Sequence, residues 1–216
     1  MAGDASCMKS LVAYEKIRDM ILVGEKLPGT RLILSDLEEE LGIGRGPIRE
    51  ALMRLDRSGL VKNIPYKGAL VASPPTQKEI CILFDIRQEL EAQMVSEAIN
   101  NLTPETLSNI VALHEQMKNV DRGFYSLDRQ FHHAIHETAK LPHISNIVDK
   151  LVESVEVFLT LYRQESQDKQ RFVEEHEAIV TAIKNKDVVQ AREAMRTNIL
   201  GGLEIVERRF SQFITK

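Results

Sequence analysis

The sequence predicts a mainly α-helical protein in which a winged helix-turn-helix precedes an all-α, antiparallel helical bundle. Apolar residues recur at helical spacing through most of the chain, whereas two short β-prone runs lie within residues 59–72. Ser73-Pro74-Pro75-Thr76 is the clearest breaker of secondary structure. We therefore expect a flexible tail over residues 1–10, the winged domain over 11–72, a linker over 73–76 and a helical domain over 77–216.

The first two helices of the winged domain are predicted from apolar spacing and capping. Ser35-Asp36-Leu37-Glu38 has the pattern of a capping box, with Leu37 and Leu41 pointing into the core. A helix over residues 11–22 should precede it. The residues that this first helix would turn inward are Leu11, Ile17, Met20 and Ile21.

The stretch Arg45-Gly46-Pro47-Ile48-Arg49-Glu50-Ala51-Leu52 carries the strongest functional signal in the chain. Pro47 suits a first helical position because its missing N–H costs nothing there. Arg49 lies off the apolar face, and Arg45 stands just before the expected helix start. A second helix with arginines at its N-terminal end, after a glycine-containing turn, is typical of a DNA-binding helix-turn-helix. Its buried face would be formed by Ile48, Ala51, Leu52 and Leu55.

Two β-prone runs follow, on either side of Lys67-Gly68. They predict a hairpin, or wing. A basic wing tip beside such a helix can contact phosphates or a neighbouring minor groove. Arginines on a helix are more often simply solvated, but the adjacent wing favours the DNA-binding interpretation.

Beyond the linker, the sequence predicts six helices. Thr103 suits an N-cap with Pro104 at the first helical position, and Leu141-Pro142 separates the third helix from the fourth. Six antiparallel helices of this length form a bundle. The expected spans are 77–100, 103–120, 123–139, 143–163, 167–185 and 187–212.

Asp128 and His132 are four residues apart and therefore share one face of the third bundle helix. His176, on a later helix, can face them across the bundle, and a carboxylate with imidazoles is a workable metal site. His136 lies about 12 Å along the helix from Asp128, which is too far to share its ion. The alternative is a buried, hydrogen-bonded polar network without a ligand.

Arg87, in the first bundle helix, has two interpretations. Its guanidinium can pair with a ligand carboxylate through two parallel hydrogen bonds. An ion pair with Glu91, one turn on, fits the sequence equally well. His114 and His143 are expected at the surface.

Charge and composition narrow the class of protein. The net charge of −4 divides into +1 for residues 1–72 and −5 for residues 73–216, so attraction to DNA must come from local placement of basic groups. Cys7 and Cys81 are far apart and indicate reduced thiols in a cytoplasm. No apolar run approaches the roughly 18 residues of a membrane helix, and the N-terminus lacks a signal-peptide pattern. We expect a cytoplasmic protein without membrane contact.

Residues 11–72 resemble the DNA-binding domain of the GntR family of bacterial transcription regulators. The matching pieces are Leu27-Pro28-Gly29-Thr30-Arg31-Leu32, Leu37, Leu41-Gly42, Arg45–Leu52, Leu55, Gly59-Leu60-Val61 and Lys67-Gly68-Ala69. The resemblance implies base and phosphate contacts by Arg45 and Arg49, and close backbone approach at Gly46. Gly44 stands where relatives often have Ser or Thr. The DNA-binding residues that the resemblance implies are Arg31, Ser35, Gly44, Arg45, Gly46, Arg49, Lys67 and Gly68.

The helical part resembles the FCD effector domain of the FadR-type branch, in its shorter, VanR-like six-helix subgroup. The matches are Arg87 with Leu90-Glu91, Asp128 with Phe131-His132, Glu175-His176 with Ile179 and Ala182, and Asp187, Ala191 and Met195. The resemblance implies that Asp128, His132 and His176 ligate a divalent metal such as zinc, nickel or manganese. We expect Arg87 and Asn198 to join these residues in binding an effector.

Asn198 departs from the family pattern. It stands 22 residues after His176, where the family has a third His ligand, and an amide oxygen is a poorer ligand for zinc or nickel. Three outcomes stay open: weaker metal binding, a harder ion, or direct binding of an organic ligand without metal.

These features predict a ligand-responsive transcription regulator that binds a pseudo-palindromic operator in double-stranded DNA as a homodimer. A small organic acid would shift the placement of the two winged domains and change DNA affinity. The resemblance implies that ligand binding more commonly releases the DNA, as in a repressor. A metal-dependent enzyme is disfavoured because His133 stands where the zinc-protease helix needs its glutamate base. A DNA-binding architectural protein is disfavoured because such proteins are small and basic.

Overall fold

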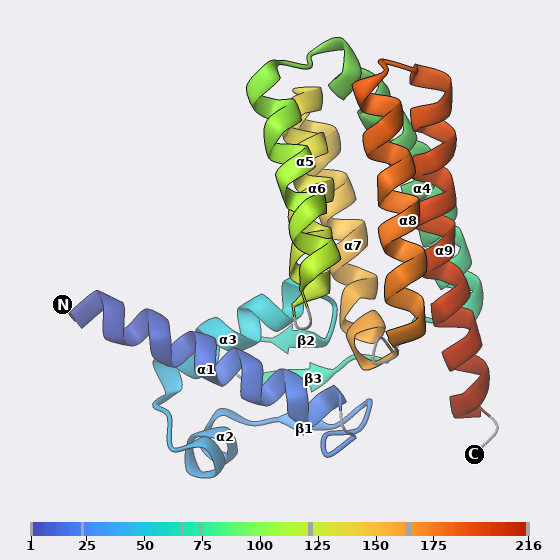
Figure 1. Cartoon of the computed structure of the whole chain (residues 1–216). Helices are drawn as coiled ribbons and strands as arrows, with labels where there is room; N and C mark the ends of the chain where they lie inside the picture. Colours follow the sequence, from blue (N-terminus) through green and yellow to red (C-terminus); the bar gives the residue numbers. More distant parts are fainter. Residues whose placement is uncertain are drawn as a thin grey trace. The chain divides into compact units, whose positions relative to one another are not determined.

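The computed structural model describes residues 2–22, 24–65, 67–73, 75–120, 123–162 and 166–214 (Figure 1). The chain divides into two compact units: Met1–Thr76 with Val152–Leu161, and Gln77–Leu151 with Tyr162–Lys216. The boundary between Thr76 and Gln77 follows directly after Ser73–Thr76, the predicted break in secondary structure. Grouping Val152–Leu161 with the first unit departs from the single domain expected over residues 77–216. Apolar periodicity marks this segment as helix but does not show which unit it joins.

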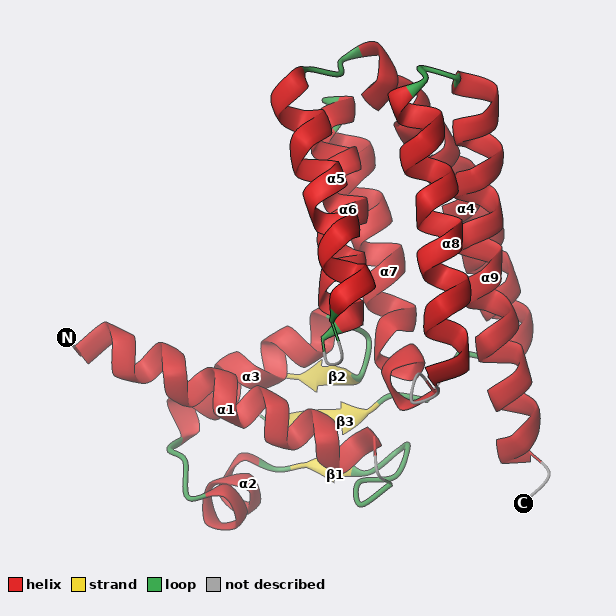
Figure 2. Cartoon of the chain, in the orientation of Figure 1, coloured by secondary structure: helices red, strands yellow, loops and turns green. Residues whose placement is uncertain are grey.

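The first unit contains helices and a three-stranded antiparallel sheet (Figure 2). β3 lies in the middle of the sheet and pairs with both other strands. Its hairpin with β2 forms the wing, so the predicted winged helix-turn-helix is confirmed. The elements are α1 (Ala2–Leu22), β1 (Arg31–Leu32), α2 (Leu34–Leu41), α3 (Arg45–Arg57), β2 (Val61–Ile64) and β3 (Gly68–Val71).

α1 begins earlier than the sequence analysis expected. It starts at Ala2, so the flexible tail over residues 1–10 was wrong; this stretch contains two alanines and no proline, and its one glycine, Gly3, lies near the start of the helix. The inward position of Leu11 was also wrong, since that residue is 41% exposed. Ala13 and Ile17, both fully buried, set the inward face of the helix instead.

The starts of α2 and α3 also differ from the predicted ones. α2 begins at Leu34 with Ile33 as its N-cap, so Ser35 forms no capping box; its hydroxyl donates to the Asp36 carboxylate at 2.9 Å. α3 begins at Arg45 after an extended Gly44, which places Pro47 third rather than first in the helix. A proline there still lies in the first turn, where backbone N–H groups have no helical partner. The predicted buried face is confirmed: Ile48, Ala51, Leu52 and Leu55 are all buried.

The second unit is the predicted bundle of antiparallel helices (Figure 1). α4 packs against α9 and α6, α5 packs against α6 and α8, and α8 packs against α9. The predicted cap at Thr103 is confirmed, because its hydroxyl accepts from the Thr106 N–H and Pro104 follows as the first helical residue. No described helix has the length and apolar character needed to cross a membrane. The helices that follow Thr76 in the chain are α4 (Gln77–Asn100), α5 (Pro104–Asn119), α6 (Phe124–Ala139), α7 (Pro142–Tyr162), α8 (Ser166–Lys184) and α9 (Val188–Ile214). Val152–Leu161 of α7 belongs to the first unit.

Candidate functional site

A concave surface of the first unit brings together most of the residues expected to bind DNA. It encloses about 430 Å³ between β1, the start of α2, the start of α3 and the wing tip. Gly44 and Gly46 flank Arg45 in the chain and are exposed. Basic side chains from separate elements thus face the same hollow, although each element carries few of them. The lining residues are Arg31, Ile33, Leu34, Ser35, Arg45, Arg49, Lys67 and Gly68.

The arginines of this surface are accessible to solvent. Arg45 donates through Nε to Oε2 of Glu38 at 2.6 Å, and 57% of its side chain stays exposed. Arg31 donates to the backbone carbonyl of Lys67 at 3.4 Å, which links β1 to the wing tip. Arg49 is exposed as well. The guanidinium groups are therefore available to phosphates or bases.

Two glycines of this surface differ in what the fold requires of them. Gly68 has a φ of +91°, and a Cβ there would lie 2.0 Å from the carbonyl oxygen of Leu32. Only glycine fits this close approach between strands. A Cβ at Gly46 would meet nothing within 4 Å, so the backbone of α3 is open to approach at that point.

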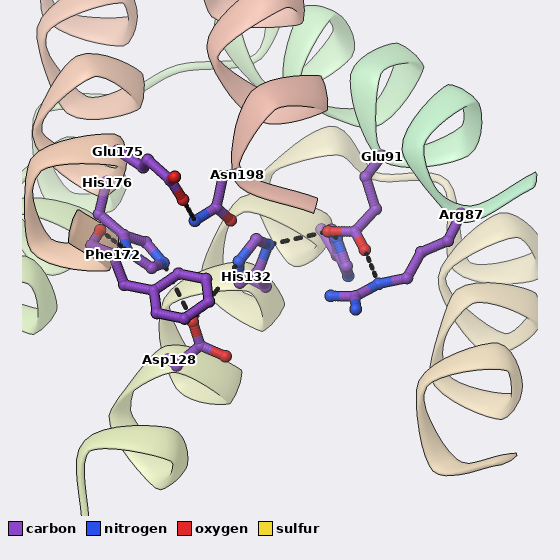
Figure 3. A network of polar contacts seen from close by, with 9 residues as sticks. Arg87, Glu91, Asp128, His132, Phe172, Glu175, His176 and Asn198 are labelled. Atoms are coloured by element: carbon purple, nitrogen blue, oxygen red, sulfur yellow. Dashed lines mark hydrogen bonds and ion pairs between the residues drawn. The ribbon is translucent and has the colours of Figure 1, made fainter. Parts of the chain in front are cut away.

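Asp128, His132 and His176 meet in the interior of the second unit (Figure 3). α6 places Asp128 and His132 one turn apart on the same face, and α8 brings His176 opposite them. Nε2 of His176 lies 3.1 Å from Oδ1 of Asp128, and Nε2 of His132 lies 3.9 Å from the same oxygen. Two imidazoles thus converge on one carboxylate oxygen.

The hydrogen bond of Nδ1 shows which nitrogen of the His176 ring carries the proton. Nδ1 lies 2.5 Å from the carbonyl oxygen of Phe172, and because a carbonyl can only accept, Nδ1 carries the proton. In the neutral ring, Nε2 is then an acceptor that faces a second acceptor, Oδ1 of Asp128. This buried Nε2 has no hydrogen bond among the described residues. A cation between the two acceptors, or a second proton on the ring, would relieve the repulsion.

Glu91, on α4, is a site residue that was not expected at the metal or effector site from the sequence. Its side chain is completely buried, accepts from Nδ1 of His132 at 2.8 Å and lies 3.2 Å from Nε2 of His136. A carboxylate that orients an imidazole through Nδ1 leaves Nε2 toward the ligand position, a common arrangement around protein-bound metals. His136 therefore lies with Glu91 rather than with Asp128. The two histidines are 41 and 45 residues from Glu91, so spacing within one helix could not link them.

Arg87 completes this set of buried charges. Its Nε donates to Oε1 of Glu91 at 2.6 Å, so the ion pair one turn apart is present. Burial raises the pKa of Glu91, but Arg87 and His132 outweigh it and hold that pKa well below its ordinary value. Burial lowers the pKa of His132, but Glu91 and Asp128 outweigh it and raise that pKa. Arg87 and Glu91 therefore form a buried pair of opposite charges.

A small cavity adjoins these side chains. It offers about 20 Å³ to a water-sized sphere, close to the room that one water molecule needs. Asn198, buried on α9, donates to Oε2 of Glu175 at 3.2 Å. Burial raises the pKa of Glu175 to about 6, against the opposing effects of Arg171 and Asn198. The lining residues are Arg87, Tyr125, Asp128, His132, Phe172, Asn198, Ile199 and Gly202.

His114, Glu115 and Glu177 form a separate polar group. His114 is 1% exposed, so its expected surface position was wrong; its ring packs near that of Phe131, with centroids 6.4 Å apart. Nε2 of His114 lies 2.8 Å from Oε2 of Glu177, and the ammonium of Lys118 lies 2.6 Å from the same oxygen. Because the lysine already supplies a cation, this group is a poor metal site.

Comparison with known proteins identifies the family. Residues 9–71 match the bacterial regulatory proteins of the gntR family, and residues 82–200, more than half of the chain, match the FCD domain. The chain belongs to the GntR family of bacterial transcription regulators. Its first unit carries the family's DNA-binding domain and its bundle is an FCD domain, as found in transcription regulators rather than in enzymes.

Characterised relatives match over most of their length. The chain is 25% identical to the HTH-type transcriptional regulator McbR of Escherichia coli, over 94% of this chain and 95% of McbR. It is 26% identical to the transcriptional repressor GlaR of E. coli, over 92% and 96% of the two chains. It is 28% identical to the gluconate operon transcriptional repressor of Bacillus subtilis, over 82% and 75%. A solved structure of E. coli McbR shares the fold, with a TM-score of 0.71 at 23% identity over 94% of this chain and 98% of McbR.

Proposed function

We propose that this regulator is a homodimeric repressor that leaves its operator when a small organic acid binds the FCD domain. The acid would bind beside a divalent metal held by Asp128, His132 and His176. The observation that carries the proposal is the convergence of two imidazole Nε2 atoms on Oδ1 of Asp128, at 3.1 and 3.9 Å.

The donor set fits a divalent ion. Two imidazoles and a carboxylate suit zinc, nickel or manganese, and both Nδ1 atoms already donate to acceptors, Glu91 and the Phe172 carbonyl. The buried Nε2 of His176, which has no hydrogen bond to any residue that the structure describes, supports the same assignment. A bound ion would supply a Lewis-acid partner for the carboxylate of the effector. Arg87 lines the adjoining cavity and would contribute further donors to that carboxylate.

A metal-free sensor is the second candidate. Asn198 uses its amide Nδ2 to hold Glu175, and the third imidazole of the family is absent at this position. In that case Arg87, His132 and Asn198 would bind the organic acid directly. The cavity of about 20 Å³ must enlarge for either candidate to admit an acid.

DNA binding is assigned to the concave surface of the first unit. Exposed Arg45 and Arg49 at the start of α3 would contact bases and phosphates, while Lys67 would contact phosphates from the wing. Gly46 would allow close backbone approach. Two such units in a dimer would recognise a pseudo-palindrome. GlaR and the B. subtilis gluconate regulator are both named as repressors, and this supports repression here.

The sensing proposal is tested on the full chain with neighbouring histidines. Elemental analysis and native mass spectrometry of the purified protein report a bound ion or acid. His132→Ala should remove the ion, lower zinc affinity in calorimetry and abolish the response to the identified effector, while operator binding stays intact. His133→Ala is the matched control because its side chain is 54% exposed. A His132→Ala protein that still binds zinc and responds normally would place the sensor elsewhere.

A further inference from the structure

We infer that Glu38 is a positioning residue that sets the sequence selectivity of Arg45. The inference rests on the proposed DNA-binding function and adds to it a residue outside the expected contact set. Glu38 lies on α2, whereas Arg45 is the first residue of α3. Nε of Arg45 and Oε2 of Glu38 are 2.6 Å apart, which is short even for a hydrogen bond between charged groups.

This contact occupies one nitrogen of the guanidinium and leaves its outer edge available. Within the described part of the chain, the contacts of Arg45 engage Nε and neither terminal nitrogen. The two terminal nitrogens form an edge that can donate to O6 and N7 of a guanine together. Holding Nε therefore orients the edge without blocking it.

Glu38 is suited to this role because its backbone is fixed. The preceding residue, Leu37, is 2% exposed and packs in the core of the first unit. Gly42 ends α2 in the left-handed conformation, with φ 65°, and its N–H donates to the carbonyl of Glu38. The carboxylate thus projects from an anchored turn of helix, and a supporting residue on a rigid element restricts the side chain that it holds.

Glu38 has two effects on DNA that experiment can separate. Its negative charge beside the basic surface opposes phosphates of any sequence. Its orientation of Arg45 matters only at the base that Arg45 contacts. Removing the charge should raise affinity for all DNA, whereas losing the orientation should lower the preference for the operator.

The same helix provides matched controls. Glu39 is exposed and carries the same charge one residue further on. Glu40 pairs with Lys26 at 3.0 Å rather than with an arginine of the DNA-binding surface. Alanine at either position removes a carboxylate from α2 without touching Arg45.

The test uses the full chain and two duplexes. Selection from a random-sequence pool with the wild-type protein supplies the operator, and a scrambled version supplies the reference. Glu38→Ala should lower the ratio of operator to scrambled affinity roughly tenfold, within the range of one bidentate base contact. Glu38→Gln, whose amide oxygen still accepts from Nε, should keep the ratio within about threefold of wild type. Glu39→Ala and Glu40→Ala should leave the ratio unchanged.

A double substitution checks that Glu38 acts through Arg45. Glu38→Ala combined with Arg45→Ala should give the same ratio as Arg45→Ala alone. A wild-type ratio in Glu38→Ala, or additive losses in the double variant, would overturn the inference. Should Glu38→Ala fail to fold by circular dichroism, Glu38→Ser replaces it in the same comparison. If the wild-type protein selects no sequence from the pool, the proposed DNA-binding function itself fails.

Discussion

The DNA-binding surface and the buried cluster of the bundle handle charge in opposite ways. In the first unit, Arg45 has one ion pair with the residues that the structure describes, and its side chain is 57% exposed. In the second, Glu91 is completely buried and contacts Arg87, His132 and His136. One region keeps its charges available for a partner, whereas the other neutralises its charges within the fold.

The difference shows how location decides what a charged residue contributes. An exposed ion pair adds little to stability, so its members remain free to bind another molecule. A buried charge that loses its partner is strongly destabilising, so its members are tied to the fold. Substitutions in the two regions should therefore affect different measurements: DNA affinity in the first, stability and ligand binding in the second.

The strongest test of this contrast is on α4. Glu91→Ala should lower the free energy of unfolding by about 3–5 kcal/mol, because it leaves the buried Arg87 without its partner. Glu89→Ala, on the same helix, breaks exposed ion pairs with Arg192 and Arg196 and should cost less than about 1 kcal/mol. Urea denaturation measures both. Equal losses in the two variants would remove the distinction between the regions.

Two glycines sharpen the comparison within the DNA-binding surface. Gly68→Ala should lower the free energy of unfolding by at least about 2 kcal/mol, from the strained positive φ and the clash with Leu32. Gly46→Ala should stabilise the protein by up to about 1 kcal/mol, because alanine favours the helix. If DNA approaches the backbone at Gly46, that more stable variant will bind the operator less tightly. Thermal unfolding and band-shift assays measure the two effects separately.

Arg45→Ala should affect DNA binding and leave stability nearly unchanged. We expect a loss of about 1–3 kcal/mol in operator binding if Arg45 makes a bidentate base contact. Arg57→Ala is the control, since Arg57 is exposed near the opposite end of α3. Footprints and binding curves that do not change with Arg45→Ala would remove this residue from the DNA contact.

The smallest expected effect is a change in stability that depends on pH and comes from Glu177, a half-exposed carboxylate. Lys118, and then His114, lower the pKa of Glu177 to about 2 from its ordinary value of 4.5. A lowered carboxyl pKa stabilises the folded state above about pH 4.5 and loses that effect as the pH falls toward 2. Glu177→Gln should therefore cost less than about 1 kcal/mol at pH 7. The gap in Tm from wild type should narrow at pH 3.5.

An exposed neighbour provides the control for this pH test. Glu174→Gln, on the same helix, should shift the Tm little at either pH. A Glu177→Gln gap that widens as the pH falls would contradict the assigned role of Lys118.

Local signals in the sequence predicted the elements and part of the site. Helix periodicity, the breaker at Ser73–Thr76 and the cap at Thr103 depend on neighbouring residues, so they are visible in one sequence. The pairing of Asp128 with His132 is equally local, because residues four apart share a helix face. Contacts between helices are not visible in this way, and the link from Glu91 to the histidines was therefore missed.

Errors occurred where local patterns do not determine the result. The start of α1 was placed too late because small residues are compatible with both helix and loop. Leu11 was assigned to the core because its side chain is apolar, yet the phase of a helix is set by the residues that pack. His114 was assigned to the surface because it is polar, yet it is buried in α5 between the core residues Ile110 and Met117.

The two imidazoles that face Asp128 are aligned by partners of different origin. The ring of His176 is oriented by a carbonyl four residues earlier in its own helix, so its orientation does not depend on how the helices pack. The ring of His132, on α6, is oriented by a carboxylate from α4, so its orientation depends on the relative position of α4 and α6. The orientation of the His176 ring is thus fixed within one helix, whereas that of the His132 ring depends on the spacing between α4 and α6. An ion bound between the two rings would therefore favour one spacing of α4 and α6, and by thermodynamic reciprocity that spacing would raise the affinity for the ion.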